Sequence, residues 1–211
     1  MGKAFFVLVL FLLFPMACCY AETANKGVDY YNKVIVSNPQ NAEAYRQRGL
    51  AYELEHNTTK AMIDYNKGIQ INPKVALLYW NRGLLSYKIE DYDQAIIDFS
   101  KYLQSKPNSP LTLLMRGQAY YKKGDYDLAV SDFYAHMNAK DEVGKWGPYF
   151  AYLDLSWVYL KKKDYDKAWE FARKAVVEES INHPNSTQST IGLSLSSELI
   201  AELRKVSGRE K

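Results

Sequence analysis

Three short segments of the chain each contain an aspartate, a tyrosine and a second aspartate in a row. They are KIEDYDQAIIDF at 88–99, KKGDYDLAVSDF at 122–133 and KKKDYDKAWEF at 161–171. Two carboxylates so close together could act as a general acid and base, or as ligands of a metal ion. They could also mark the start of a helix, where acidic side chains accept hydrogen bonds from free backbone N–H groups.

The spacing of these segments favours the second interpretation. Asp91, Asp125 and Asp164 are 34 and 39 residues apart, and a period of about 20–50 residues is typical of repeat proteins. An earlier copy has Asn57-Thr58-Thr59 in place of Asp-Tyr-Asp. That change keeps a capping side chain but removes both carboxylates. The motif therefore predicts helix caps, formed by residues such as Asp91 or Asp125, and not a repeated catalytic or metal site.

Other positions follow the same period. The first three units share a glycine, an alanine 12 residues later and an aromatic residue four further on, and a proline recurs at the ends of successive units. The small residues allow two helices to approach closely, the aromatic residues fill the space between adjacent units, and the proline ends the second helix. The positions are Gly49, Gly83, Gly117 and Ser156; Ala61, Ala95, Ala129 and Ala168; Tyr65, Phe99 and Phe133; and Pro39, Pro73 and Pro107. This pattern predicts antiparallel helix pairs that stack on one another.

The repeated segments resemble the tetratricopeptide repeat family. AYRQRGLAYELEHNTTKAMIDYNKGIQINP at 44–73 carries almost the whole family pattern, and 79–107 and 113–133 follow it closely. The segment 149–180 is looser, with Ser156 for glycine, Ala172 for the aromatic residue and Phe171 beside it. The resemblance implies an all-α fold, a right-handed superhelical solenoid of antiparallel helix pairs. It also implies an N-terminal orphan helix, because 28–39 matches only the second helix of a unit.

We expect a chain of repeats between two different ends. The last segment has apolar residues every four positions, at Ile191, Leu195, Leu199 and Leu203, and predicts a C-terminal capping helix. The expected organisation is a signal peptide at 1–21, an N-terminal helix at 22–40, repeats at 41–74, 75–108 and 109–142, an inserted loop at 143–148, a degenerate repeat at 149–182, and the capping helix and tail at 183–211.

The N-terminal segment predicts export. Its apolar run AFFVLVLFLLFPM is too short to span a bilayer as a helix but suits a signal peptide. Cleavage after Ala21 would release a periplasmic or secreted protein. Alternatively, Ala17-Cys18 resembles the end of a bacterial lipobox, which would make Cys18 the site of lipidation in a membrane-anchored lipoprotein. No cysteine follows Cys19, so the exported domain has no disulfide framework and no thiolate nucleophile.

The rest of the composition excludes several classes of function. The net charge of +3 and the mixing of lysines with acids give no basic patch for nucleic acid. His56, His136 and His183 are far apart, and none belongs to a zinc or nucleophile motif. We therefore predict no enzymatic activity, no cofactor and no metal site.

The resemblance instead implies a binding surface, since the first helices of tetratricopeptide repeats line a concave groove for a peptide or partner helix. The predicted groove residues are Arg46, Trp80, Leu84, Tyr87, Lys88, Gln118, Tyr121, Lys122, Phe150, Trp157 and Lys161. Leu50, Trp80, Leu84 and Leu114 stand where one branch of the family grips a C-terminal carboxylate, so that clamp is not expected. The face is apolar and aromatic, with lysines along one side, as binding hot spots often are.

Two questions stay open at the level of sequence. The groove could be free for a partner, or filled by the C-terminal helix or by the helix before Pro39. The protein itself could be an adaptor of the cell envelope that binds another protein, or a structural subunit that self-associates through stacked repeats. An enzyme with site residues hidden in its loops ranks third.

Overall fold

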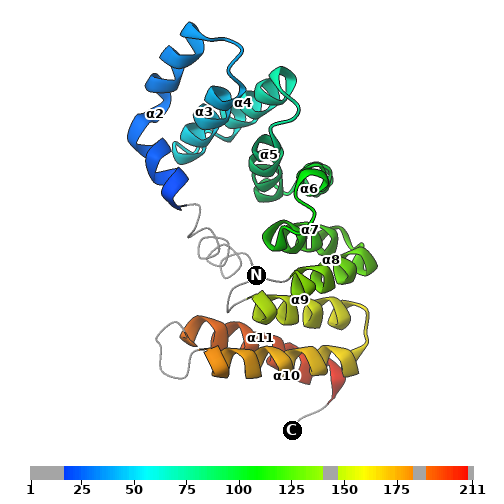
Figure 1. The fold of residues 1–211 in the computed structure, drawn as a ribbon. Helices are drawn as coiled ribbons and strands as arrows, with labels where there is room; N and C mark the ends of the chain where they lie inside the picture. The colour runs from blue at the N-terminus through cyan, green and yellow to red at the C-terminus, as the bar shows by residue number, and fades with distance from the viewer. Residues whose placement is uncertain (1–16, 140–146, 183–188, 209–211) are drawn as a thin grey trace. The chain divides into compact units, whose positions relative to one another are not determined.

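Every regular element in the described part of the chain is an α-helix. The computed structural model (Figure 1) describes residues 17–139, 147–182 and 189–208. Most of the predicted signal peptide at 1–21 and of the inserted loop at 143–148 lies outside these ranges. The expected all-α fold of paired helices is confirmed.

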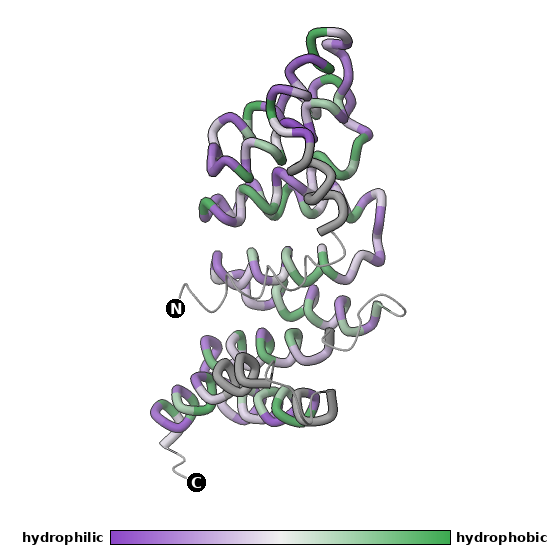
Figure 2. The backbone as a smooth tube through the Cα atoms, turned by 90° about the vertical axis from the view of Figure 1, so that its left-hand side faces the viewer, coloured by the Kyte–Doolittle hydropathy of each residue, from purple (hydrophilic) through white to green (hydrophobic). Residues whose placement is uncertain are grey.

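The helices follow the periodicity of the sequence. They are α2 (Ala17–Ser37), α3 (Ala42–Leu54), α4 (Thr58–Ile71), α5 (Ala76–Lys88), α6 (Tyr92–Ser105), α7 (Pro110–Lys123), α8 (Tyr126–Asn138), α9 (Gly147–Lys161), α10 (Tyr165–Asn182) and α11 (Ser189–Ser207). The pairs α3 and α4, α5 and α6, α7 and α8, and α9 and α10 pack side by side (Figure 1). Polar and apolar segments alternate along the helices, as expected for elements with one buried face (Figure 2). The chain divides after Ser105 into two units, one with α2 to α6 and the other with α7 to α11.

In the first unit, α2 lies where the second helix of a preceding repeat would lie, and no first helix of that repeat is present among the described residues. The helix is kinked at Gly27, which has a left-handed backbone (φ 58°, ψ 174°). Beyond the kink, Asn32 Oδ1 accepts a hydrogen bond of 2.8 Å from Arg48 Nη1 on α3. Asn66 on α4 accepts the equivalent bond of 2.6 Å from Arg82 on α5. The same contact one repeat later confirms the orphan helix.

The repeated glycines make room for the repeated aromatic residues. A Cβ atom on Gly83 would lie 2.9 Å from Phe99 Cε1, and one on Gly117 would lie 2.7 Å from Phe133 Cε1. The aromatic ring therefore packs on the glycine of its own repeat, which the sequence did not predict. It also contacts the next repeat as expected, because Tyr65 shares a buried cluster with Leu78 and Leu85 of α5.

Most of the predicted caps are present. Side-chain oxygens of Asn57, Asp91 and Asp164 accept hydrogen bonds from backbone N–H groups at the starts of α4, α6 and α10, at 3.2, 3.1 and 3.2 Å. Asp125 is an exception and corrects the prediction, because its side chain makes no cap bond. Its carboxylate lies 3.6 Å from Lys123 Nζ instead.

A repeated ion pair joins the two helices of a unit. The pairs Arg48–Asp64, Arg82–Asp98 and Arg116–Asp132 each have N···O distances of 2.7 Å. Each arginine reaches both carboxylate oxygens through Nε and Nη2, the bidentate geometry that strengthens such bonds. The fourth repeat has Leu155 and Phe171 in these places, and both are buried.

The second unit ends in the predicted capping helix. Leu199 and Leu203 of α11 are fully buried, and Trp169 Nε1 on α10 donates a 3.2 Å hydrogen bond to Ser207 Oγ. The side chains of Ile191 and Leu195 lie outside the described residues. The helix packs mainly on α10 and touches α9 less, as α5 packs on α4 and touches α3.

A residue with a left-handed backbone follows each first helix, directly after α7 and one position later after α3, α5 and α9. Gly124 has φ 90°, whereas His56, Glu90 and Lys163 have φ between 57° and 65°, a conformation costly for residues with a Cβ atom. We expect Lys163→Gly to raise the free energy of unfolding by about 0.5–1 kcal/mol in urea denaturation. Gly124→Ala should lower the free energy of unfolding by about 1 kcal/mol. The cause would be backbone strain and not a steric clash, because no atom lies within 4 Å of the added Cβ. Equal stability of all three proteins would contradict this account.

Candidate binding faces on the first helices

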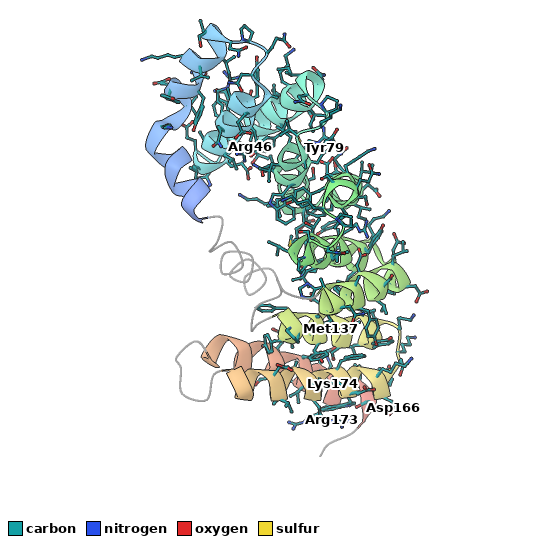
Figure 3. All side chains as sticks on the ribbon, in the orientation of Figure 1. Arg46, Tyr79, Met137, Asp166, Arg173 and Lys174 are labelled. Carbon is teal, nitrogen blue, oxygen red and sulfur yellow. The ribbon has the colours of Figure 1, made fainter. Side chains whose placement is uncertain are left out.

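The first unit presents the predicted groove residues of α3 and α5, and their accessibility varies. Arg46 (Figure 3) is buried and bonded to Glu43 on its own helix, with an Nη2···Oε1 distance of 2.6 Å. Leu84 and Tyr87 are half-buried, and Lys88 is exposed. The Tyr87 ring also packs edge-on against Tyr92, at 5.5 Å between centroids. Leu84, Tyr87 and Lys88 therefore remain accessible on this unit.

Trp80 is a packing residue, which corrects its expected place among the accessible groove residues. Its side chain is only 2% exposed. The ring centroid lies 5.6 Å from that of Phe99 and 5.4 Å from that of Tyr102, both on α6. The sequence placed Trp80 correctly on a first helix, but the size of the ring lets it fill the space between α5 and α6.

A carboxylate on α3 also lies near this face. Glu53 on α3 accepts a hydrogen bond from the hydroxyl of Tyr65. Burial raises the pKa of Glu53, while the Tyr65 hydrogen bond and the charge of Lys88 oppose that rise. Glu53 is thus hydrogen-bonded within its own repeat, and we do not expect its carboxylate to bind a partner.

The second unit presents the groove residues of α7 and α9. Gln118 and Phe150 are buried, at 3% and 8% exposure. Tyr121 and Trp157 are half-buried, whereas Lys122 and Lys161 are exposed. The accessible part of this face therefore combines two aromatic side chains with two lysines.

A hydrogen bond between two polar side chains of this face joins α7 to α9. Gln118 Nε2 donates a 2.7 Å hydrogen bond to Asp154 Oδ2. Burial raises the pKa of Asp154 to about 7, against the lowering effects of the Gln118 bond and the Lys122 charge. Burial also raises the pKa of Tyr121 to about 12, with contributions from Tyr126 and Asp154. Asp154 does not stand out in the sequence, because its position is Gln47, Asn81 or Met115 in the other repeats and the carboxylate does not recur.

The raised pKa of Asp154 predicts a pH-dependent effect on stability. The folded state binds a proton here between about pH 4 and pH 7 while the unfolded state does not, so this group favours folding less as the pH rises. We expect Asp154→Asn to match the wild type at pH 4 and to be more stable above pH 7, by on the order of 2 kcal/mol. Urea unfolding at pH 4, 6 and 8 measures the difference. A constant difference across this range would show that Asp154 titrates normally.

Each end helix continues the stack of helices in its own unit. Because α11 packs on α10 and only partly on α9, it continues the stack beyond the last repeat. In the first unit, α2 packs on α3 in the place of a second helix. Among the described residues, neither end helix lies across the first helices as a groove-filling segment would.

The described residues offer little else for chemistry. They contain no group of three histidine, cysteine, aspartate or glutamate side chains arranged to hold a metal ion. His136 is buried, with Nδ1 2.8 Å from the Pro110 carbonyl oxygen, and His56 is exposed at a helix end. No described helix is both long and apolar enough to cross a membrane.

Stacked antiparallel helix pairs, built on glycine–aromatic contacts, define an all-helical repeat protein. The tetratricopeptide repeat model matches residues 42–75, 76–109, 112–135 and 151–176, more than half of the chain. The chain belongs to the tetratricopeptide repeat family. Members of this family in general bind other proteins and are in general not catalysts.

Solved structures support the same fold. MamA from Desulfovibrio magneticus is 15% identical, with a TM-score of 0.70 over 87% of this chain and 99% of that one. YrrB, described as a protein with an unusual peptide-binding site, is 19% identical, with a TM-score of 0.67 over 87% and 88%. PilF from Pseudomonas aeruginosa is 19% identical, with a TM-score of 0.61 over 82% and 72%. No curated protein sequence matches the chain.

Proposed function

We propose that the protein is a non-catalytic adaptor of the cell envelope that binds a peptide or helix of another protein across its first helices. The observation that carries this proposal is the α7–α9 face, where the aromatic side chains of Tyr121 and Trp157 are partly exposed beside the exposed Lys122 and Lys161. Half-buried aromatic residues bury large areas on binding and lose little conformational freedom. YrrB, of the same fold, is described as having a peptide-binding site.

The place of action is inferred from the N-terminal segment. Its apolar run fits a signal peptide, and the two processing sites, Ala21 and Cys18, predict different mature proteins. Mass spectrometry of the N-terminus of the protein from the producing cell distinguishes them. A chain that begins at Glu22 supports soluble export, a lipid-modified Cys18 supports an anchored lipoprotein, and an intact Met1 argues against the envelope.

Capture from a cell-envelope extract tests the adaptor function. The immobilised protein is compared with the variant Tyr121→Ala/Trp157→Ala and with the control Tyr30→Ala, which removes an exposed ring on α2. Circular dichroism checks that all three are folded. We expect one set of partners to be held by the wild type and the control and lost by the double variant. Identical partners on all three would place binding elsewhere.

Self-association is the second candidate function. Ile63 on α4 and Ile97 on α6 occupy the same register of the first unit and are 60% and 54% exposed. Exposed apolar residues that recur from repeat to repeat could pair copies of the chain. Light scattering between micromolar and millimolar concentrations measures the molecular mass of the wild type and of Ile63→Lys/Ile97→Lys. A mass that rises with concentration for the wild type, but stays that of a monomer for the variant, would favour a structural subunit.

A further inference from the structure

Two polar side chains on the α7–α9 face are specific to their repeats. The position of Gln118 is Leu50, Leu84 or Trp157 in the other units, and that of Asp154 is Gln47, Asn81 or Met115. The other repeats have an apolar residue at the Gln118 position and no carboxylate at the Asp154 position. The fold therefore does not require the Gln118–Asp154 pair, although the two residues are bonded directly across neighbouring repeats.

The bond leaves one side of the carboxylate available. Gln118 is itself 3% exposed, and its Nε2 holds Asp154 Oδ2 at 2.7 Å. Oδ1 accepts no hydrogen bond from the described residues, and the Asp154 side chain is only half-buried. A carboxylate that has lost water without gaining a full set of donors is costly, and a cationic donor would offset that cost.

The surroundings favour a flat cation. Tyr121 on α7 lies close enough for the charge of Asp154 to raise its pKa. Trp157 is three residues after Asp154 on α9, a spacing that puts the two side chains on one face of the helix. Both rings are partly exposed. A guanidinium group can bond a carboxylate in its plane while its faces stack on aromatic rings, which an ammonium group cannot do as well.

We propose that Asp154 binds an arginine side chain of the partner peptide, with Gln118 orienting the carboxylate and Tyr121 and Trp157 flanking the guanidinium. The proposal rests on the proposed adaptor function and names the chemistry of its partner. Lys122, whose charge acts on Asp154 in the free protein, competes with the arginine. Removing Lys122 should therefore strengthen binding, whereas removing the charge of Asp154 should weaken it.

Selection from a library of random 12-residue peptides tests the proposal on the full-length protein at pH 8. We expect the selected peptides to share an arginine at one fixed position. For the best peptide, fluorescence anisotropy should show affinity reduced at least about tenfold by Asp154→Asn, and likewise by alanine in place of the shared arginine. Lys122→Gln should increase affinity about threefold, and the control Asp166→Asn on α10 should leave it unchanged.

A pH series adds a measurement that a purely structural role would not affect. Wild-type affinity should fall as the pH drops from 8 to 5.5, since Asp154 takes up a proton, while the affinity of Asp154→Asn should stay level. The charged and titratable groups around Asp154 are Lys122 and Tyr121, and burial raises the pKa of Tyr121 to about 12, far above this range. Selected peptides without a shared basic residue, or with a shared acidic one, overturn the arginine site and leave the adaptor function standing. Failure to select any peptide counts against both.

Discussion

Replacing Arg82 by leucine will lower the free energy of unfolding by about 3–5 kcal/mol, because it leaves the carboxylate of Asp98 buried without a counter-charge. Asp98 is fully buried, and Arg82 supplies two hydrogen bonds to it, from Nε at 2.8 Å and from Nη2 at 2.7 Å. Gln94 provides only one further bond, at 3.1 Å. Urea denaturation followed by circular dichroism at pH 7 measures the loss.

The pH dependence of this loss identifies its cause. Burial raises the pKa of Asp98 even with Arg82 beside it, so without the arginine the carboxyl group will take up a proton more readily in the folded state. The loss caused by Arg82→Leu should therefore be smaller at pH 5 than at pH 8. The double variant Arg82→Leu/Asp98→Leu should recover most of the stability, since an apolar pair of similar volume avoids the desolvation cost. Wild-type stability in the single variant would show that the ion pair contributes little.

The fourth repeat already contains an apolar solution to the same packing problem. Asp132-Phe133 of the third repeat corresponds to Phe171-Ala172 of the fourth. The aromatic ring of the fourth repeat therefore stands one position closer to the start of its helix. Phe171 is stacked on Tyr159 at 5.5 Å, with an interplanar angle of 4°. The ring takes the place of the aspartate, the arginine partner becomes Leu155, and both charges disappear together.

The same change explains why glycine is not needed there. With Ala172 in place of the ring, the opposing residue can carry a side chain, and Ser156 is fully buried. Its hydroxyl donates a 2.7 Å hydrogen bond to the Ala168 carbonyl oxygen. Four positions thus change as one group, which is the expected behaviour of residues that share a contact.

The fold could be predicted from the sequence because its determinants recur at a fixed period. Gly83 and Phe99 belong to the register that the sequence analysis identified, and their contact follows from pairing the two helices. The ion pairs could have been found by the same approach, since arginine and aspartate recur 16 residues apart at Arg48–Asp64, Arg82–Asp98 and Arg116–Asp132. They were missed because charged residues on helices usually face water.

The binding face was less predictable because its side chains depart from the period. Trp80 was placed on the face by its position, but its ring packs against α6. Asp154 was overlooked because a single aspartate carries no motif, and its importance depends on Gln118 from another repeat. Only the structure shows which residues of neighbouring first helices meet.

Replacing Gly83 by serine will also be strongly destabilising, by about 2–3 kcal/mol. The added Cβ would lie 2.9 and 3.0 Å from two ring atoms of Phe99 and 3.2 Å from Asp98 Cβ. Phe99 is fully buried and its ring centroid is 5.6 Å from that of Trp80, so the ring has no free space into which it can move. Thermal and urea unfolding of the full-length protein measure the loss.

A double-mutant cycle separates this clash from a general loss of helix stability. If the serine is costly because of the ring, Gly83→Ser and Phe99→Ala together will destabilise the protein by at least about 1 kcal/mol less than the sum of the two single changes. Gly83→Ser combined with Phe133→Ala, whose ring packs on Gly117 instead, should give additive losses. Additive losses in both pairs would mean that Gly83 and Phe99 do not constrain each other. Coupling in the first pair alone would show that the ring of Phe99 is what excludes a side chain at Gly83.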